Sequence, residues 1–317
     1  MKKTKKIVSA ILTIIIVVCI VLAGVLLVYD YLSDRRQESL LSEYREQASQ
    51  AAESETATDW AQEAEPSDAT TSDTDTSDTK HPPAEISTEI ADTDKSAPTE
   101  ETIPEIPRIP NPYADSFLAN EDMVAWIQIP GTNVDYPVMW TPRDENYYLY
   151  RDFDHSENKN GSLILDTDSC LEPLTTNLII HGHNMRSGAM FGNLTDYENE
   201  NFYKEHKYIT LYTGECQRNY EVIAVFRSQV YKKSDTVFKF YKFFQADTAE
   251  EFEDFYKNIK EMSQYDTGIT AEFGDRFLTL STCVYHVENG RFVVVAKEIE
   301  EGDYYEPVVT ETDINTP

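Results

Sequence analysis

An uncharged apolar run, Ile7–Tyr29, is the feature that most limits what this chain can fold into. A helix of more than about 20 apolar residues is long enough to cross the hydrocarbon core of a bilayer. A cleaved signal peptide has a shorter apolar region that ends at a small-residue cleavage site. Lysine occupies four of the first six positions, and positive charge favours the cytoplasmic side. We therefore expect one uncleaved transmembrane anchor at residues 7–29, with residues 1–6 in the cytoplasm and the rest outside the cell.

Residues 30–106 are strongly acidic. The whole chain has a formal net charge of −30, and Gln37–Thr102 contains 18 Asp and Glu but only 3 Lys and Arg. This composition argues against nucleic acid as a partner, because no basic patch is available to neutralise phosphates. Good helix formers at 33–65, with Ser33 as a plausible N-cap, indicate a juxtamembrane helix.

The second part of this region, Pro66–Ile103, consists mostly of Thr, Ser, Asp, Glu and Pro. Such a segment has too little apolar surface to offset the entropy of ordering it. We interpret residues 30–106 as an acidic tether, helical at 33–65, that holds a folded domain away from the membrane. Because we expect the tether to contribute nothing to the core, the domain should fold without residues 1–105.

The folded domain is expected at residues 107–299, followed by an acidic tail at 300–317. About eight short runs rich in Val, Ile, Tyr and Phe are separated by turn residues, which favours a mainly β closed barrel or a sandwich. The clearest helix is Ala249–Met262, which has apolar residues at helical spacing and a cap at Asp247 or Thr248. The expected strands are 123–130, 134–140, 162–165, 177–181, 208–212, 220–228, 277–281 and 292–296.

Three of the four cysteines lie outside the apolar run: Cys170, Cys216 and Cys283. An odd number of cysteines outside the cell leaves at least one free thiol. A Cys170–Cys216 disulfide and two unpaired buried thiols are both compatible with the sequence.

Cys283 and Arg291 lie in the stretch TLSTCVYHVENGRFVVVAK, residues 279–297. The runs on either side are rich in Val, Thr and Phe, which favour strands, and Glu288-Asn289-Gly290 is typical of a turn. The pattern predicts a hairpin in which the thiol and the guanidinium lie at facing ends of neighbouring strands.

A second motif, NLIIHGHNM at 177–185, places His181 and His183 at the end of an apolar strand. Residues two apart on a strand share a face, so this pair could ligate zinc if at least one further ligand were nearby. Two polar side chains at a barrel rim are the simpler interpretation. A third interpretation is that His183 transfers protons for Cys283. A thiol that attacks an amide needs a nearby base, and the leaving amine needs a proton. Arg291 would then favour the thiolate or hold a developing oxyanion.

TLSTC with an arginine eight residues after the cysteine, together with IIHGHNM, resembles the signature of sortases, the cysteine transpeptidases of Gram-positive surfaces. VAWIQIPGTNVDYPVMW (124–140) and YYLYRDFDHSENKNGSLILD (147–166) resemble class B sortases in particular. The resemblance covers about residues 113–299. It implies a closed eight-stranded sortase barrel with N-terminal helical turns and one helix in a late connection between strands.

The resemblance also implies a catalytic set of His183, Cys283 and Arg291, with substrate contacts at Ser281 and Thr282 and with no metal or cofactor. Asn184 occupies a variable position and receives no role from it. His286 has no place in the motif, and it remains a rival base alongside its simpler interpretation as a solvated loop histidine.

The activity implied by the resemblance is transpeptidation by a membrane-anchored enzyme whose catalytic domain lies outside the cell. Cys283 would cleave the sorting motif of a secreted protein after threonine and form a thioacyl intermediate. An amine of a cell-wall peptide or a pilin lysine would then resolve it. Two alternatives stay open: a cysteine hydrolase of the cell surface, which would normally use an Asn or Asp to orient the histidine, and a non-catalytic wall-binding module. Which sorting motif is read also stays open.

Overall fold

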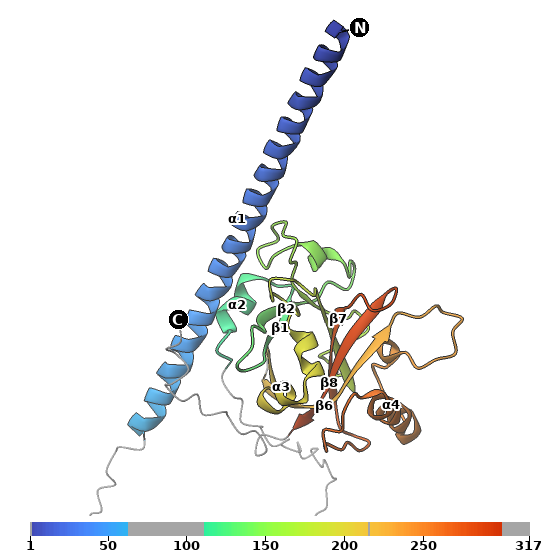
Figure 1. Cartoon of the computed structure of the whole chain (residues 1–317). Helices are drawn as coiled ribbons and strands as arrows, with labels where there is room; N and C mark the ends of the chain where they lie inside the picture. The colour runs from blue at the N-terminus through green and yellow to red at the C-terminus, as the bar shows by residue number, and fades with distance from the viewer. Residues whose placement is uncertain (1, 63–110, 215, 300–317) are drawn as a thin grey trace, which may run out of the picture.

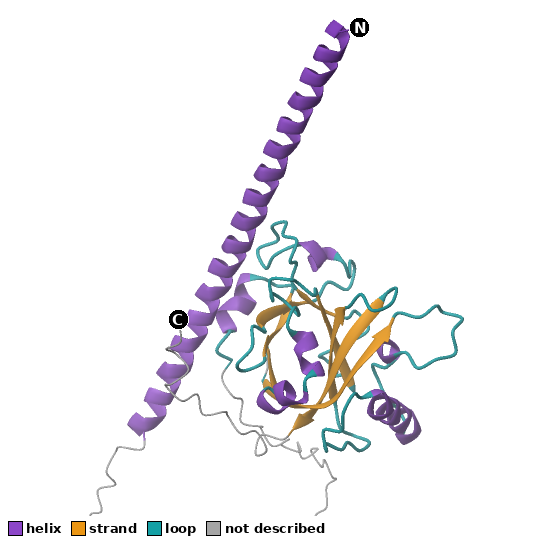
Figure 2. Ribbon diagram, in the orientation of Figure 1, coloured by secondary structure: helices purple, strands orange, loops and turns teal. Residues whose placement is uncertain are grey.

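Eight strands close into a barrel in the order β1-β2-β3-β4-β7-β8-β6-β5 (Figures 1 and 2). The computed structural model describes residues 2–62, 111–214 and 216–299. The prediction of a mainly β, closed eight-stranded barrel is confirmed. The strands are β1 (Met123–Gln128), β2 (Asp135–Met139), β3 (Leu163–Leu165), β4 (Asn177–Gly182), β5 (Tyr208–Thr213), β6 (Gln217–Gln229), β7 (Phe277–Cys283) and β8 (Gly290–Ile299).

Helices lie outside this barrel. Those described are α1 (Lys2–Gln62), α2 (Ala114–Ala119), α3 (Glu200–Glu205) and α4 (Ala249–Met262), with short 3-10 helices η1 (Tyr147–Tyr150), η2 (Leu194–Glu198) and η3 (Phe240–Lys242). The expected helical turns before the barrel correspond to α2. The expected late helix is α4, between β6 and β7, and it has the bounds that its sequence periodicity predicts. It begins with a capping box formed by Thr248 and Glu251.

Two hydrophobic clusters stabilise the barrel. The interior contains Leu178, Leu280 and Val294 among other buried side chains. The second cluster lies between α4 and the outer face of β6, β7 and β8. Strands β7 and β8 are therefore buried on both faces, which explains why their sequences are almost continuously apolar or small rather than alternating.

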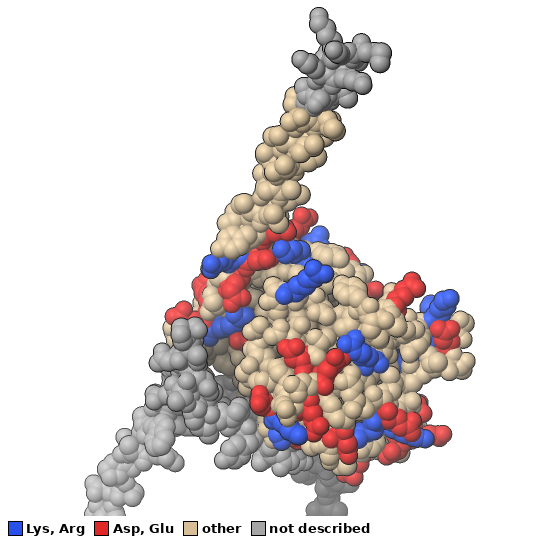
Figure 3. All heavy atoms as spheres, in the orientation of Figure 1, with Lys and Arg blue, Asp and Glu red and all other residues tan. Residues whose placement is uncertain are grey.

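Helix α1 extends far beyond the barrel and carries the apolar run (Figure 1). In the part of the chain that the structure describes, it is the one helix long and apolar enough to cross a membrane. Its large side chains from Leu12 to Leu32 are exposed. In Figure 3 the described part of this helix that extends beyond the barrel is uncharged, and charged residues gather where the helix meets the barrel.

The same helix continues past the apolar run and packs against the barrel. Leu41 and Ala48 are 2% and 4% exposed and belong to the same hydrophobic cluster as the barrel interior. Arg45 donates from Nη2 to the Asp135 carbonyl oxygen at 2.7 Å, and its Nε lies 3.2 Å from the Asp135 carboxylate. The expectation that nothing before residue 107 contributes to the core is therefore wrong. The helix expected after the apolar run is present, and residues 33–62 are its described part. The expected segment 66–103 and the tail 300–317 lie outside the described residues.

The cysteines are all free in the structure, so Cys170 and Cys216 form no disulfide. The Cys170 thiol donates to the Glu172 carbonyl oxygen at 3.0 Å. The question that the sequence left open is thus answered by two unpaired thiols.

We predict that Leu41→Ala lowers the free energy of unfolding by about 2–5 kcal/mol, the range for removing a buried leucine side chain. Thermal unfolding of the full chain in detergent micelles measures the effect. The matched control is Leu118→Ala, because Leu118 on α2 is 86% exposed. Equal melting temperatures for the two variants would show that α1 does not pack on the barrel.

Candidate active site

Strand pairing aligns three residues at one end of the barrel. Strands β4 and β7 are parallel, with Cα partners His181↔Ser281 and Gly182↔Thr282, so His183 emerges beside Cys283. Strands β7 and β8 are antiparallel, and Cys283 is paired directly with Arg291. Since neighbouring strands lie about 4.8 Å apart, these residues form one row across three adjacent strands. We call His183, Cys283 and Arg291 the row.

Three local features fasten the strand ends that carry the row. Gly182 has no room for a side chain, because an added Cβ would lie 2.5 Å from Leu163 and 2.6 Å from Phe191. The Thr282 hydroxyl donates to the Gly182 carbonyl oxygen at 2.7 Å. The Asn184 side-chain amide donates to the Cys283 carbonyl oxygen at 2.9 Å. The loop after β4 is thereby held to the end of β7.

The row opens onto a cleft of about 470 Å³. The row and the ends of β4 and β7 form one side, and η1 and the end of β3 contribute the other residues. Apart from the row, the cleft is lined by Glu145, Asn146, Leu149, Tyr150, Ser162, Ile164, Leu165, Asp166, Thr167, His181, Gly182, Ser281 and Thr282.

A backbone carbonyl orients His183. Its Nε2 lies 2.8 Å from the carbonyl oxygen of Leu149, and its ring lies 5.4 Å from that of Tyr150, centroid to centroid. Because a carbonyl oxygen only accepts, Nε2 carries the proton and Nδ1 of the neutral ring is free to accept one. In cysteine and serine hydrolases of other folds an Asn or Asp side chain contacts the histidine, whereas here His183 contacts a backbone carbonyl.

Arg291 is half-buried at the start of β8. Its Nη1 donates to the carbonyl oxygens of Gly290 at 3.1 Å and Asn289 at 3.4 Å. A guanidinium has five N–H donors, so these two bonds to the turn hold the group while leaving donors for the cleft. His286, the rival base, is exposed. It is not among the residues that line the cleft, and its ring lies beside Gly290.

The two proposed substrate contacts differ in their surroundings. The Ser281 hydroxyl is buried and has no hydrogen-bond partner among the described residues, although it lines the cleft. A buried hydroxyl without a partner is costly, and a ligand in the cleft could supply one. The Thr282 hydroxyl already donates to Gly182, which leaves it only as an acceptor.

His181 faces the same cleft but pairs with a carboxylate. Its Nε2 lies 2.9 Å from Asp166 Oδ2. Burial alone would raise the pKa of Asp166, but the hydrogen bond and charge of His181 lower it below its ordinary value. Among the residues that the structure describes, no group of three His, Cys, Asp or Glu side chains is placed to hold a metal ion. The zinc interpretation of His181 and His183 therefore has no third ligand in this region.

The sequence reasoning did not identify Leu149, Tyr150 or Asn184 as parts of the site. Leu149 acts through its backbone, which leaves no signal in residue type. Asn184 follows His183 directly, but the bond to Cys283 depends on strand register that the sequence does not state. The one sequence feature that could have indicated a role for Asn184 is its position at a strand end, next to the candidate base His183.

Comparisons with known proteins agree with this geometry. Residues 127–299 match the family model of the sortase domain. The chain is 32% identical over 182 residues to sortase B of Listeria monocytogenes, covering 56% of this chain and 70% of that protein. It is 30% identical over 186 residues to sortase B of Staphylococcus aureus, covering 57% and 72%.

Solved structures are similar as well. A mutant form of Clostridium perfringens sortase B superposes with a TM-score of 0.54 at 32% identity, covering 60% of this chain and 87% of that chain. A Staphylococcus aureus sortase B–substrate complex superposes with a TM-score of 0.54 at 27% identity, covering 62% and 88%.

One carboxyl group near the site gives a pH prediction. Asp152 follows η1 and is buried, and burial raises its pKa from 3.8 to about 6. Because the pKa of Asp152 is higher in the folded protein than in the unfolded chain, protonation of this carboxyl group stabilises the folded state. That contribution to the free energy of unfolding is present at low pH and is lost as pH rises through about 6. We expect Asp152→Asn to gain melting temperature relative to the unsubstituted protein at about pH 7 but not at about pH 4.

The gain should be a few degrees, since about 1 kcal/mol moves the melting temperature of a domain this size by roughly 2–4 °C. Asp115→Asn, the same exchange at an exposed position, is the control. A pH-independent difference between Asp152→Asn and the unsubstituted protein would contradict the assignment.

Proposed function

Because this chain belongs to the sortase family, in its class B branch, we propose that it cleaves a sorting motif after threonine and transfers the acyl group to an amine. The observation that carries the proposal is the row, in which register alone places a histidine, a cysteine and an arginine side by side at the mouth of one cleft. A thiol, a proton carrier and a fixed cation are the groups that acyl transfer through a thioester requires.

The first half of the reaction forms a thioester. The Cys283 thiol gives its proton to Nδ1 of His183, and the resulting thiolate attacks the carbonyl carbon of the motif threonine to form a C–S bond. The oxyanion that develops is stabilised by N–H donors of Arg291, whose guanidinium is held at the cleft by the turn carbonyls. His183 then gives a proton to the departing amine as the C–N bond breaks.

The second half reverses these steps with a new amine. The incoming amine attacks the thioester carbon, His183 accepts its proton, and the Cys283 thiolate leaves. In both halves the Leu149 carbonyl holds the ring in one orientation while Nδ1 gains and loses the proton. Ser281 contributes its buried hydroxyl to the bound peptide, which supplies the partner that it lacks within the described residues.

The substrates follow from this chemistry and from the anchor. A Staphylococcus aureus sortase B has been solved as a substrate complex, and we propose a comparable partner here: a secreted protein with a C-terminal sorting motif. The acceptor is an amine of a cell-wall peptide or a pilin lysine. Helix α1 holds the enzyme in the membrane, with the N-terminal lysines in the cytoplasm and the barrel outside.

Product analysis tests the proposal. Peptides with NPQTN-like and LPxTG-like motifs are incubated with the full chain in detergent, with and without an added amine. We expect an amide product with the amine and slower hydrolysis without it. Cys283→Ala should abolish both, whereas Cys170→Ala and Cys216→Ala should keep most of the activity. Hydrolysis at an unchanged rate with no amide product would support a cysteine hydrolase instead, and activity in Cys283→Ala would remove the proposed nucleophile.

The role of Arg291 gives a second prediction. Lysine keeps the positive charge but lacks the planar fork of donors, so Arg291→Lys should lower turnover by about 10²–10³, the usual effect of removing an oxyanion donor. The melting temperature should not change. His286→Ala is the control, because that side chain is exposed and does not line the cleft. Near-normal turnover in Arg291→Lys would show that the guanidinium does not hold the oxyanion.

A further inference from the structure

The loop that holds His183 is itself held by the membrane-proximal helix. We call residues 147–161, which run from η1 to the start of β3, the strap. The strap provides the Leu149 carbonyl that accepts from His183 Nε2 at 2.8 Å and the Tyr150 ring beside the imidazole. Any movement of the strap at Leu149 therefore moves the acceptor that orients the histidine.

Backbone hydrogen bonds on either side of Leu149 join the beginning of the strap to its end. The Ser162 N–H donates to the Tyr148 carbonyl oxygen at 3.0 Å, and the Asn158 N–H donates to the Tyr150 carbonyl oxygen at 3.0 Å. Gly161, with φ of 61°, lies directly against Leu149, because an added Cβ would overlap the Leu149 carbonyl oxygen. Gly161 thus lies close to the carbonyl oxygen that His183 binds.

Gln37 of α1 secures Gly161. Its side chain is 6% exposed, and its Nε2 donates to the Gly161 carbonyl oxygen at 2.9 Å. Its Oε1 accepts from the Asn158 side chain at 3.3 Å and from the Asn160 side chain at 3.1 Å. One buried amide on the helix therefore bonds three polar groups of the strap. The two asparagine side chains also donate to Asp152 and Asp34, whereas the Gly161 carbonyl oxygen has Gln37 as its hydrogen-bond donor, so it is the group left unpaired without that amide.

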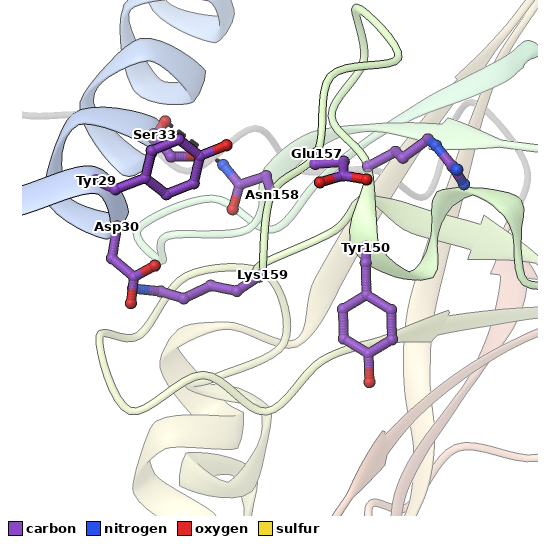
Figure 4. Close-up of a pocket in the computed structure, with 8 residues that line it drawn as sticks. Tyr29, Asp30, Ser33, Tyr150, Glu157, Asn158 and Lys159 are labelled. Carbon is purple, nitrogen blue, oxygen red and sulfur yellow. Dashed lines mark hydrogen bonds and ion pairs between the residues drawn. The ribbon is translucent and has the colours of Figure 1, made fainter. Parts of the chain in front are cut away.

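Weaker contacts join α1 to the strap, and Figure 4 shows Lys159 beside Asp30 and Asn158 beside Ser33. Lys159 lies 3.3 Å from Asp30 and 3.4 Å from Asp34. Arg36 pairs with Asp154. Asn158 also donates to the Ser33 carbonyl oxygen at 3.5 Å. The charged side chains of these pairs are between 28% and 64% exposed, so solvent screens each pair and each contributes little. Gln37 makes the buried hydrogen bonds between α1 and the strap.

We propose that Gln37 is a positioning residue for the catalytic histidine, acting through Gly161 and the Leu149 carbonyl. The juxtamembrane part of α1 is on this account a component of the active-site scaffold rather than a spacer. The connection runs Gln37–Gly161–Leu149–His183, with each step a direct contact. The inference rests on the proposed function only for its kinetic consequence, because the structural link to His183 has its own readout.

The test compares Gln37→Leu with Gln47→Leu in the full chain in detergent micelles. Leucine nearly keeps the volume of glutamine but satisfies none of the three polar groups. Gln47 is the matched control, since it is on the same helix and exposed. We expect Gln37→Leu to lower kcat on a sorting peptide by about ten- to a hundredfold, the scale for a small misplacement of a catalytic group. KM should stay within about twofold, because Gln37 does not itself line the cleft.

A spectroscopic readout separates orientation from general destabilisation. With ¹⁵N-labelled histidine, and His183→Gln to assign the signal, Nε2–H of His183 should give a hydrogen-bonded resonance in the unsubstituted protein. That resonance should shift in Gln37→Leu and stay in place in Gln47→Leu. If Gln37→Leu does not unfold cooperatively, Gln37→Glu supplies the measurement, because it keeps the shape and the acceptor but loses the donor to Gly161.

Each outcome decides a different question. An unchanged kcat and an unchanged His183 resonance in the Gln37 variants would overturn the inference. A fall in kcat and in melting temperature together with a rise in KM would also overturn it, because it would show a merely structural role. If the unsubstituted protein processes no sorting peptide, the proposed function fails, while the resonance still reports whether Gln37 orients His183.

Discussion

The parallel pairing of β4 with β7 is the constraint on which the rest of the site depends. Side chains alternate faces along a strand, so a slip of one residue would turn His183 and Cys283 to opposite faces. The pair His181↔Ser281 and the pair Gly182↔Thr282 set the register. Burial on both sides by the barrel interior and by α4 makes any other register costly. The hairpin of β7 and β8 then adds Arg291 to the same end.

The barrel strands position the row, but they do not provide the hydrogen-bond acceptor that orients the His183 ring. The acceptor for His183 comes from the strap, outside the barrel, and the strap is fixed by a buried amide of α1. Two structural units of different kinds therefore meet at one imidazole: a rigid sheet that places the ring and a helix-supported loop that orients it. This division explains how a helix that is long and apolar enough to cross a membrane can influence chemistry at the end of a barrel.

The sequence predicted most of the barrel and the row but not the support around them. Strand type was readable because β7 and β8 are runs of residues that favour strands, and α4 because its apolar residues recur with helical spacing. Packing of α1 on the barrel was missed, since it rests on a few positions such as Gln37, Leu41 and Ala48 within an acidic, polar segment. The role of Leu149 was missed because a backbone carbonyl is the same in every residue. Both omissions concern contacts between segments that are far apart in the chain, which local patterns do not encode.

Isolation of the covalent intermediate tests the central claim that the row makes Cys283 the nucleophile. The full chain is mixed with a sorting peptide in the absence of any amine, quenched in acid, and examined by intact mass and peptide mapping. The account predicts a mass increase equal to the peptide portion up to its threonine, located on Cys283 and removed by hydroxylamine. An acyl group on Cys170, Cys216 or a serine, or cleavage with no acylated species under conditions that stabilise thioesters, would contradict it.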